Sequence, residues 1–137
     1  NTTASMILQF GHQLLAAKNP RLFEHSDKIL RDFIYIEDII QANIKAMNPK
    51  NSGIYNVGTG KARSFQDIVD ILQKELKTEL KCEYISNPFI GSYQFHTEAD
   101  IQSTKDALDY EPRFEMEDAI KDYVPEIIKI YEAEVKK

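Results

Sequence analysis

A short alternating segment of the chain carries the residue types best suited to bind an anionic ligand. Its alternation predicts a strand with Arg31, Phe33 and Tyr35 on one side. Arginine presents a planar set of donors that can hold a diphosphate through paired hydrogen bonds, and aromatic rings can flank a base or a sugar. The simpler interpretation is a surface strand whose arginine pairs with a nearby acid such as Asp32 or Glu24. The strand pattern alone favours the simpler interpretation.

The glycine-rich turn Gly58-Thr59-Gly60 is a second candidate, because it follows a predicted strand and precedes a predicted helix. Such turns can bind phosphate through backbone N–H groups. This one lacks the third glycine of a dinucleotide fingerprint and the Lys-Ser/Thr pair of a P-loop. A tight turn that needs a positive φ explains the glycines without a ligand, and we favour this structural interpretation.

The remaining reactive residue types show no catalytic arrangement. Histidines stand at positions 12, 25 and 96, without metal-ligand spacing, and no GxSxG, HExxH or CxxC pattern occurs. Cys82 is the only cysteine, which excludes an internal disulfide and fits a small buried side chain. Tyr93 lies in an aromatic-rich loop over residues 87–97 that either packs on the body or covers a ligand. The residues alone therefore predict neither a catalytic group nor a metal site.

The candidate ligand-binding residues are positioned by predicted helices and strands that alternate along the chain. This alternation predicts an α/β fold. Ser64 and Asp67 have capping-box spacing, and Ser103 is expected to cap a short helix. Pro125 is expected to kink the last helix or to start a new one. The expected helices cover about residues 3–17, 104–108 and 116–135, with two more starting near 37 and 64, and the expected strands cover 31–36, 54–57 and 81–85.

Composition and charge narrow the class of protein. The chain has 137 residues, with 17 Lys and Arg against 22 Asp and Glu, and 42% hydrophobic residues, which suffices for one core. The acidic excess argues against nucleic acid as a partner, and the apolar runs are too short to span a membrane. No linker or repeat divides the chain, so residues 1–137 are expected to form one unit. The chain starts at Asn1, without a secretory leader, and we expect it to be part of a larger protein.

Several of these segments together resemble a known enzyme class. The segments Arg31–Asp38, Gly53–Gly60 and Ser64-Phe65 resemble the C-terminal half of extended short-chain dehydrogenase/reductases that act on nucleotide sugars. Leu22–Ser26 and Tyr93–Asp100 narrow the resemblance to the ADP-L-glycero-D-manno-heptose 6-epimerase family, over essentially the whole chain. The resemblance implies the α/β, substrate-binding C-terminal part of a Rossmann-like enzyme, whose N-terminal Rossmann core lies largely outside this chain.

The resemblance also implies an activity. Enzymes of this family invert C6 of the heptose in ADP-heptose by oxidising the sugar with NADP⁺ and returning hydride to the opposite face. Their product enters the lipopolysaccharide inner core, and the reaction takes place in the cytoplasm. This chain contains neither a GxxGxxG fingerprint nor a Tyr-x-x-x-Lys pattern. The site for NADP (or NAD) and the catalytic tyrosine and lysine are therefore expected upstream, so that this chain alone is inactive. The family further implies a homo-oligomer.

The substrate-binding positions of the family match one loop of this chain and several single residues. The loop Phe23–Ser26 matches a Phe-Glu-Gly-Ser substrate loop, Arg31 matches a diphosphate-side arginine, and Tyr93 matches a late tyrosine. The implied substrate-binding residues are Thr2, Gln9, Phe23, Glu24, His25, Ser26, Arg31 and Tyr93.

Three of these positions depart from the family pattern. Thr2 replaces a serine and keeps its hydroxyl, whereas His25 adds bulk where glycine is common. Gln9 stands where a histidine contact is found, and it can donate a hydrogen bond but cannot titrate near neutral pH. Thr2 and Gln9 share one face of the predicted first helix, as a common pocket requires.

Two other functions stay open from the sequence. The chain is alternatively part of an epimerase or dehydratase that acts on a UDP-, GDP- or dTDP-sugar, and a preference for ADP separates these enzymes. It is otherwise a stand-alone α/β binding module without catalysis. That module should fold cooperatively alone and leave no large apolar face exposed.

Overall fold

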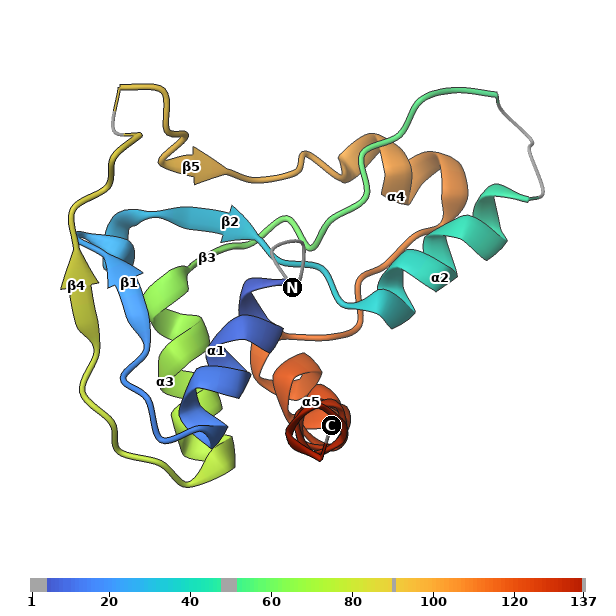
Figure 1. Cartoon of the computed structure of the whole chain (residues 1–137). Coiled ribbons are helices and arrows are strands. Elements are labelled where there is room, and N and C mark those ends of the chain that lie inside the picture. Colours follow the sequence, from blue (N-terminus) through green and yellow to red (C-terminus); the bar gives the residue numbers. More distant parts are fainter. Residues whose placement is uncertain (1–4, 48–51, 90, 137) are drawn as a thin grey trace.

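The computed structural model describes residues 5–47, 52–89 and 91–136, and short strands alternate with helices along it (Figure 1). This alternation confirms the predicted α/β class. In chain order the elements are α1 (Met6–Leu15), β1 (Arg21–Phe23), the 3-10 turn η1 (Ser26–Lys28), β2 (Leu30–Asp32), α2 (Ile36–Ala46), β3 (Ala62–Ser64), α3 (Phe65–Leu76), β4 (Glu83–Ile85), β5 (His96–Thr97), α4 (Gln102–Leu108) and α5 (Met116–Val135).

The helices α1, α3 and α5 pack against one another and form the main body (Figure 1). Their apolar stripes face inward, since residues three and four apart share one side of a helix. At Gly11 an added Cβ would lie 2.7 Å from Cγ2 of Ile127, so the glycine lets α1 and α5 approach closely. The fully buried side chains of this core include Phe10, Leu14, Ile68, Leu72, Ile120 and Ile127.

Two small sheets lie beside this body and set the positions of the candidate residues. β1 pairs with β4 in parallel. In the second sheet β2 is central, antiparallel to β3 and parallel to β5. Arg31 in β2 therefore lies opposite Arg63 on one side and Thr97 on the other.

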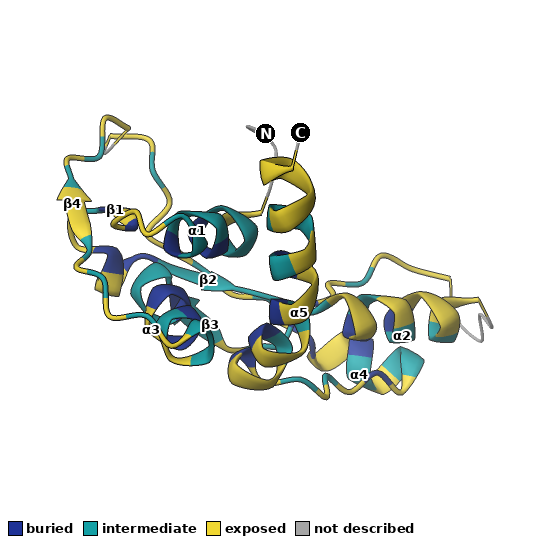
Figure 2. Cartoon of the chain, turned by 60° about the horizontal axis from the view of Figure 1, so that its bottom comes forward, coloured by how far each residue is buried: buried dark blue, intermediate teal, exposed yellow. Residues whose placement is uncertain are grey.

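The helices α2 and α4 form a smaller lobe that extends away from the three-helix body (Figure 2). A second cluster, made of Ala42, Ile101 and Tyr110, is buried there. Asp38 at the start of α2 is fully buried, and its carboxylate accepts hydrogen bonds from the backbone N–H groups of Arg113 (3.0 Å) and Phe114 (3.2 Å). These bonds connect the lobe to the segment before α5.

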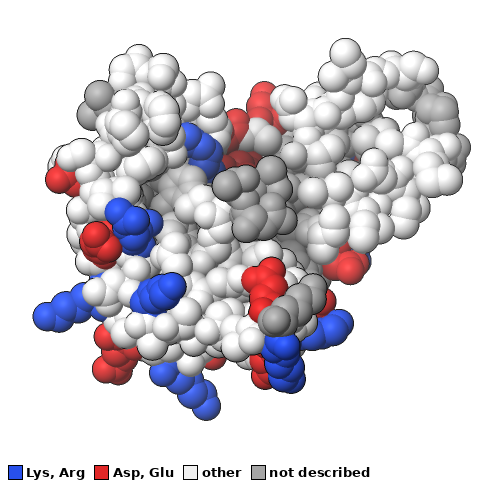
Figure 3. Space-filling model, in the orientation of Figure 1, with Lys and Arg blue, Asp and Glu red and all other residues white. Residues whose placement is uncertain are grey.

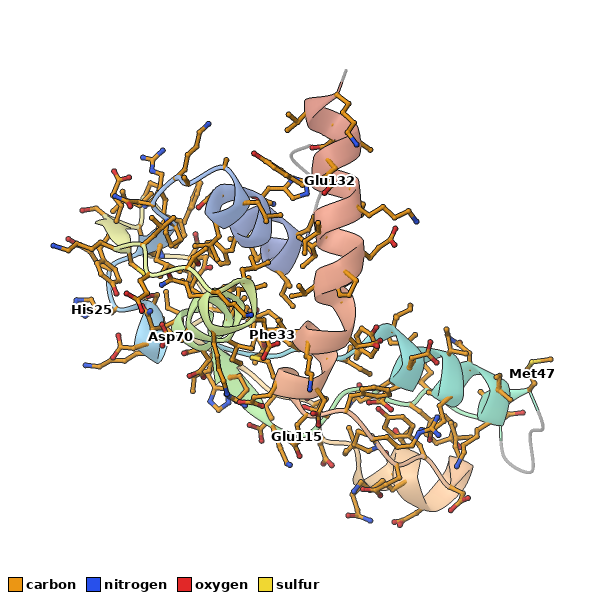
Figure 4. All side chains as sticks on the ribbon, turned by 90° about the horizontal axis from the view of Figure 1, so that it is seen from below. His25, Phe33, Met47, Asp70, Glu115 and Glu132 are labelled. Carbon is orange, nitrogen blue, oxygen red and sulfur yellow. The ribbon has the colours of Figure 1, made fainter. Side chains whose placement is uncertain are left out.

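The outer face of α2 carries large apolar side chains that are open to solvent. Met47, just after the helix, is 81% exposed and lies at the far end of the lobe (Figure 4). In the space-filling view this lobe shows few charged atoms, whereas Lys and Arg are spread around the main body (Figure 3). The exposed apolar side chains of this face, which we call the α2 face, are Ile36, Ile40, Ile44 and Met47.

Several expected elements are confirmed at their predicted places. The first helix begins at Met6, because the Ser5 side chain accepts a hydrogen bond from the N–H of Leu8, and residues 1–4 lie outside the described residues. The predicted capping box is present in full: the Ser64 hydroxyl accepts from the N–H of Asp67, whose carboxylate accepts from the N–H of Ser64.

Other expectations are wrong in detail. The strand expected over 31–36 ends at Asp32, since Tyr35 already caps α2, so Arg31, Phe33 and Tyr35 do not share one strand face. Residues 54–57 are not a strand, because no strand of the described chain pairs with them. A strand forms only where a neighbour receives its backbone hydrogen bonds.

The last two helices also differ from expectation. The fourth helix starts at Gln102, whose N–H donates to the Asp100 carboxylate, so Ser103 lies inside the helix and does not cap it. Pro125 lies inside α5, which is assigned as one helix from Met116 to Val135, so the proline does not start a new helix, one of the two alternatives expected for it. Burial of the flanking Val124 and Ile127 in the core holds the helix together where the proline removes one backbone donor.

Candidate functional site

A cavity of about 200 Å³ lies between α1, β1, the start of α3 and the loop after β4. Its walls are mostly apolar and aromatic, as is typical of sites that enclose part of an organic ligand. The lining residues are Met6, Phe10, Arg21, Leu22, Phe23, Ser26, Ile29, Phe65, Ile85 and Tyr93.

The aromatic-rich loop after β4 packs on the body and at the same time forms one wall of this cavity. Tyr93 meets Phe23 edge to face, with ring centroids 5.8 Å apart, and meets Phe95 at 6.1 Å. The alternative in which this loop packs on the body is therefore confirmed at Tyr93, and its role in covering a ligand stays a prediction. The contact joins the end of β1 to a residue 70 positions later in the chain.

Ser26 supplies a polar atom in this mostly apolar cavity. The residue is only 2% exposed, and its hydroxyl has no hydrogen-bond partner within the described chain. A buried hydroxyl without a partner costs about 1–3 kcal/mol. A ligand in the cavity that offers a donor or an acceptor would recover this free energy.

Arg31 lies beside the cavity, between two of its aromatic walls. Its Nη1 donates to the carbonyl oxygen of Leu30 (2.7 Å), and its Nη2 donates to the carbonyl oxygen of Gln94. Its guanidinium carbon lies 5.4 Å from the ring centroid of Tyr93 and 6.0 Å from that of Phe65. Carbonyl groups and ring faces attract a cation without neutralising it.

No carboxylate within the described residues forms an ion pair with Arg31. The interpretation in which Asp32 or Glu24 pairs with it is therefore wrong. Glu24 is exposed, and its carboxylate accepts from the Ser86 hydroxyl at 3.4 Å. The positive charge of Arg31 thus stays available to an anionic ligand at the edge of the cavity.

Asp32 instead binds the glycine-rich turn. Its carboxylate accepts hydrogen bonds from the backbone N–H groups of Thr59 (2.9 Å) and Gly60 (2.9 Å), and from the Thr59 hydroxyl (2.5 Å). A Cβ at Gly58 would lie 2.6 Å from this carboxylate, and Gly60 has a φ of +70°. The structural interpretation of the turn is therefore confirmed, because the anion held by the turn belongs to the chain itself.

Among the other implied substrate residues, Gln9, Glu24 and His25 are described by the structure, and none of them lines the cavity. His25 is exposed and is labelled at the edge of the molecule in Figure 4, and its backbone is left-handed, with a φ of 62°. A glycine adopts this conformation without strain, which explains why one is common here in the resembling family. Gln9 is half-buried in α1 but does not line the cavity, and Thr2 lies outside the described residues.

The structure therefore brings together Phe23, Ser26, Arg31 and Tyr93 and leaves Glu24 and His25 apart. The residue that sequence reasoning missed is Phe65, which lines the cavity and contacts Arg31. The sequence marks Phe65 only as the first apolar residue after the capping-box serine, which gives no sign of a contact with Arg31.

Neither a metal site nor a membrane-spanning helix is found in the described part of the chain. No group of at least three His, Cys, Asp or Glu side chains there is arranged to hold a metal ion. No helix within residues 5–47, 52–89 and 91–136 is long and apolar enough to cross a bilayer.

Two tyrosines make the stability of the fold depend on pH. The hydrogen bond from Tyr35 to Asp122 (2.6 Å) raises the pKa of Tyr35 to about 12, and burial raises the pKa of Tyr110 to about 12. The folded state therefore holds both protons more tightly than the unfolded chain, in which the pKa is about 10. Their contribution to stability is complete below pH 10 and is lost as the pH rises towards 12.

We expect the free energy of unfolding to fall steeply between about pH 10 and 12 for this reason. Urea denaturation at a series of alkaline pH values measures it. The fall should become shallower in Tyr35→Phe and in Tyr110→Phe, and shallowest in the double variant. An equally steep fall in the double variant would contradict this assignment.

Comparison with known proteins relates this site to one group of enzymes. No protein-family model matches the chain. The chain is 37% identical over 123 residues to ADP-L-glycero-D-manno-heptose-6-epimerase from Brachyspira hyodysenteriae, a match covering 88% of the chain and 38% of that protein. The crystal structure of the Helicobacter pylori enzyme of the same name is 48% identical, with a TM-score of 0.84, covering 93% of the chain and 39% of that structure.

The chain is homologous to part of an ADP-heptose 6-epimerase. It spans about two-fifths of the length of the relatives it matches. The UDP-glucuronic acid 4-epimerase of Bacillus cereus, solved with UDP-glucuronic acid and NAD, is 24% identical with a TM-score of 0.82, covering 93% of the chain and 40% of that structure. At this identity the likeness concerns the fold. The expected fold class, part of an extended short-chain dehydrogenase/reductase, is thereby confirmed.

Proposed function

We propose that residues 1–137 form, as one unit, the substrate-binding C-terminal part of an ADP-L-glycero-D-manno-heptose 6-epimerase. The observation that supports this most is the 48% identity to the Helicobacter pylori epimerase over 93% of the chain. Enzymes with other substrates share the fold at far lower identity, such as the UDP-glucose 4-epimerase of Thermotoga maritima at 21%.

In this function the cavity and Arg31 bind the ADP end of the substrate. The guanidinium of Arg31, which has no ion-pair partner among the described residues, would bind the diphosphate. Phe23, Ser26 and Tyr93 would hold an adjoining organic group. An epimerase must present both faces of one carbon to the same hydride donor. Binding energy from the part of the substrate that does not react can hold it while the sugar reorients.

The remaining functions belong to residues that this chain does not contain. A bound NADP or NAD would accept hydride from C6 of the heptose and return it to the other face. The catalytic tyrosine and lysine and most cofactor contacts would come from the preceding part of the enzyme.

The exposed α2 face and segment 52–57, which pairs with no strand of the described chain, offer an apolar surface for that part to cover. The enzyme would be a cytoplasmic homo-oligomer that supplies lipopolysaccharide inner-core synthesis.

The test is an epimerase assay on the full-length enzyme that contains this chain, with this chain alone as control. We expect interconversion of ADP-D-glycero- and ADP-L-glycero-D-manno-heptose by the longer protein and none by residues 1–137. Turnover by this chain alone would contradict the division of functions. Turnover of a UDP-, GDP- or dTDP-sugar in preference to ADP-heptose would replace the proposed substrate.

A further inference from the structure

The guanidinium of Arg31 is oriented by its surroundings before any ligand binds. Two of its nitrogens donate to the main-chain carbonyls of Leu30 and Gln94. The rings of Phe65 and Tyr93 lie within 6.0 Å of its central carbon. Its other N–H groups have no acceptor among the described residues and remain for an anion.

The arginine opposite in β3 differs from Arg31, because it has acidic partners of its own. Arg63 donates to both oxygens of Glu117, at 2.8 and 3.2 Å, and its Nε donates to Asp67 at 3.2 Å. These contacts raise the pKa of Arg63 and lower the pKa of Glu117. The two arginines are directly paired across the sheet, but within the described residues only Arg63 has acidic partners.

Phe65 is held more firmly than the other ring beside Arg31. It is the first residue of α3, directly after the capping box of Ser64, so its backbone is fixed at a helix start. Its ring meets the ring of Phe33 edge to face at 5.5 Å and packs against the main core. Tyr93, in contrast, belongs to a loop and is held by contacts with other rings.

We propose that Phe65 is the positioning residue of Arg31: its fixed ring holds the guanidinium at the edge of the cavity, with free N–H groups available for the diphosphate. The ring face attracts the guanidinium of Arg31. An aliphatic side chain of similar volume would fill the same space but would not orient the guanidinium. This inference rests on the proposed function, since it takes the diphosphate of a nucleotide sugar as the anion. Phe65 also lines the cavity, so the alternative is direct packing of its ring against the ligand.

A double-mutant cycle on the full-length enzyme separates the two roles. The variants are Phe65→Leu, Arg31→Lys, the combination of both, and Phe65→Tyr, which keeps the ring. Phe89→Leu is the matched control, because Phe89 is exposed and makes no ring contact with Arg31. The measured quantities are KM and kcat for ADP-heptose, the dissociation constant of ADP, and the thermal midpoint of each variant.

We expect Phe65→Leu to raise KM and the ADP dissociation constant about five- to tenfold with kcat nearly unchanged, and Phe65→Tyr to stay near the wild type. In the Arg31→Lys background, Phe65→Leu should add little, because the oriented guanidinium is already lost. Fully additive effects, or an effect no larger than that of Phe89→Leu, would overturn the proposal. If the wild type binds UDP and not ADP, the proposed function is wrong, and the same cycle measured with UDP still decides the role of Phe65.

Discussion

Replacing Asp32 with alanine should lower the free energy of unfolding by about 3 kcal/mol, the largest loss of stability we expect from a single change outside the core. The carboxylate accepts from the N–H groups of Thr59, Gly60 and Ala99 and from the Thr59 hydroxyl. Alanine leaves the three part-buried backbone N–H groups without this acceptor, whereas the Thr59 hydroxyl can still donate to the carbonyl oxygen of Lys61. The cost exceeds that of a surface ion pair, because each donor loses a partner that water replaces poorly.

Urea denaturation followed by circular dichroism would measure this loss. Asp32→Asn should cost about half as much, since the amide keeps one acceptor but turns N–H groups towards the backbone donors. Asp106→Ala is a suitable control, because Asp106 is exposed and accepts from only one side chain, that of Gln102 (2.9 Å). A loss for Asp32→Ala no greater than for this control would show that the turn does not depend on the carboxylate.

The largest functional effect is expected at Arg31. In the full-length enzyme, Arg31→Ala should raise KM for ADP-heptose about 10- to 100-fold, corresponding to a lost charge-assisted hydrogen bond of about 1.5–3 kcal/mol. The value of kcat should change much less, because the diphosphate lies away from the reacting carbon. Steady-state kinetics with both heptose epimers would measure the two constants separately.

Arg63→Ala provides the matched control for this experiment. The two arginines are paired across β2 and β3, but Arg63 is neutralised by Glu117 and Asp67. Its removal should therefore lower the thermal midpoint and leave KM almost unchanged. An unchanged KM in Arg31→Ala would remove Arg31 from the phosphate site.

Local signals predicted most of the fold. The capping box at Ser64 and the helical spacing over 116–135 each depend on residues close in sequence, and both are confirmed. The errors arose where contacts between segments far apart in sequence determine the structure. Residues 54–57 were expected to form a strand but have no partner strand within the described chain, and Asp32, expected to pair with Arg31, binds the glycine-rich turn.

The candidate site likewise contains residues that were predicted from the sequence and one that was not. The resemblance selected Phe23, Ser26, Arg31 and Tyr93, and the structure places these around one cavity. Nothing in the local sequence pairs Phe65 with Arg31, because this contact depends on the register of β2 against β3. Cross-strand neighbours are fixed by the register, which a single sequence specifies only weakly.

The bond between Asp32 and the glycine-rich turn has a consequence for how these positions vary in evolution. Asp32, Gly58 and Thr59 lie in two separate motifs, yet they form a single interlocking unit. A Cβ at position 58 would lie 2.6 Å from the Asp32 carboxylate and 2.6 Å from the Cβ of Ala99, so contacts from two other segments both require glycine there. Related sequences should therefore keep Gly58 wherever they keep Asp32 or Ala99, and a search that scores the two motifs independently would treat linked positions as separate constraints.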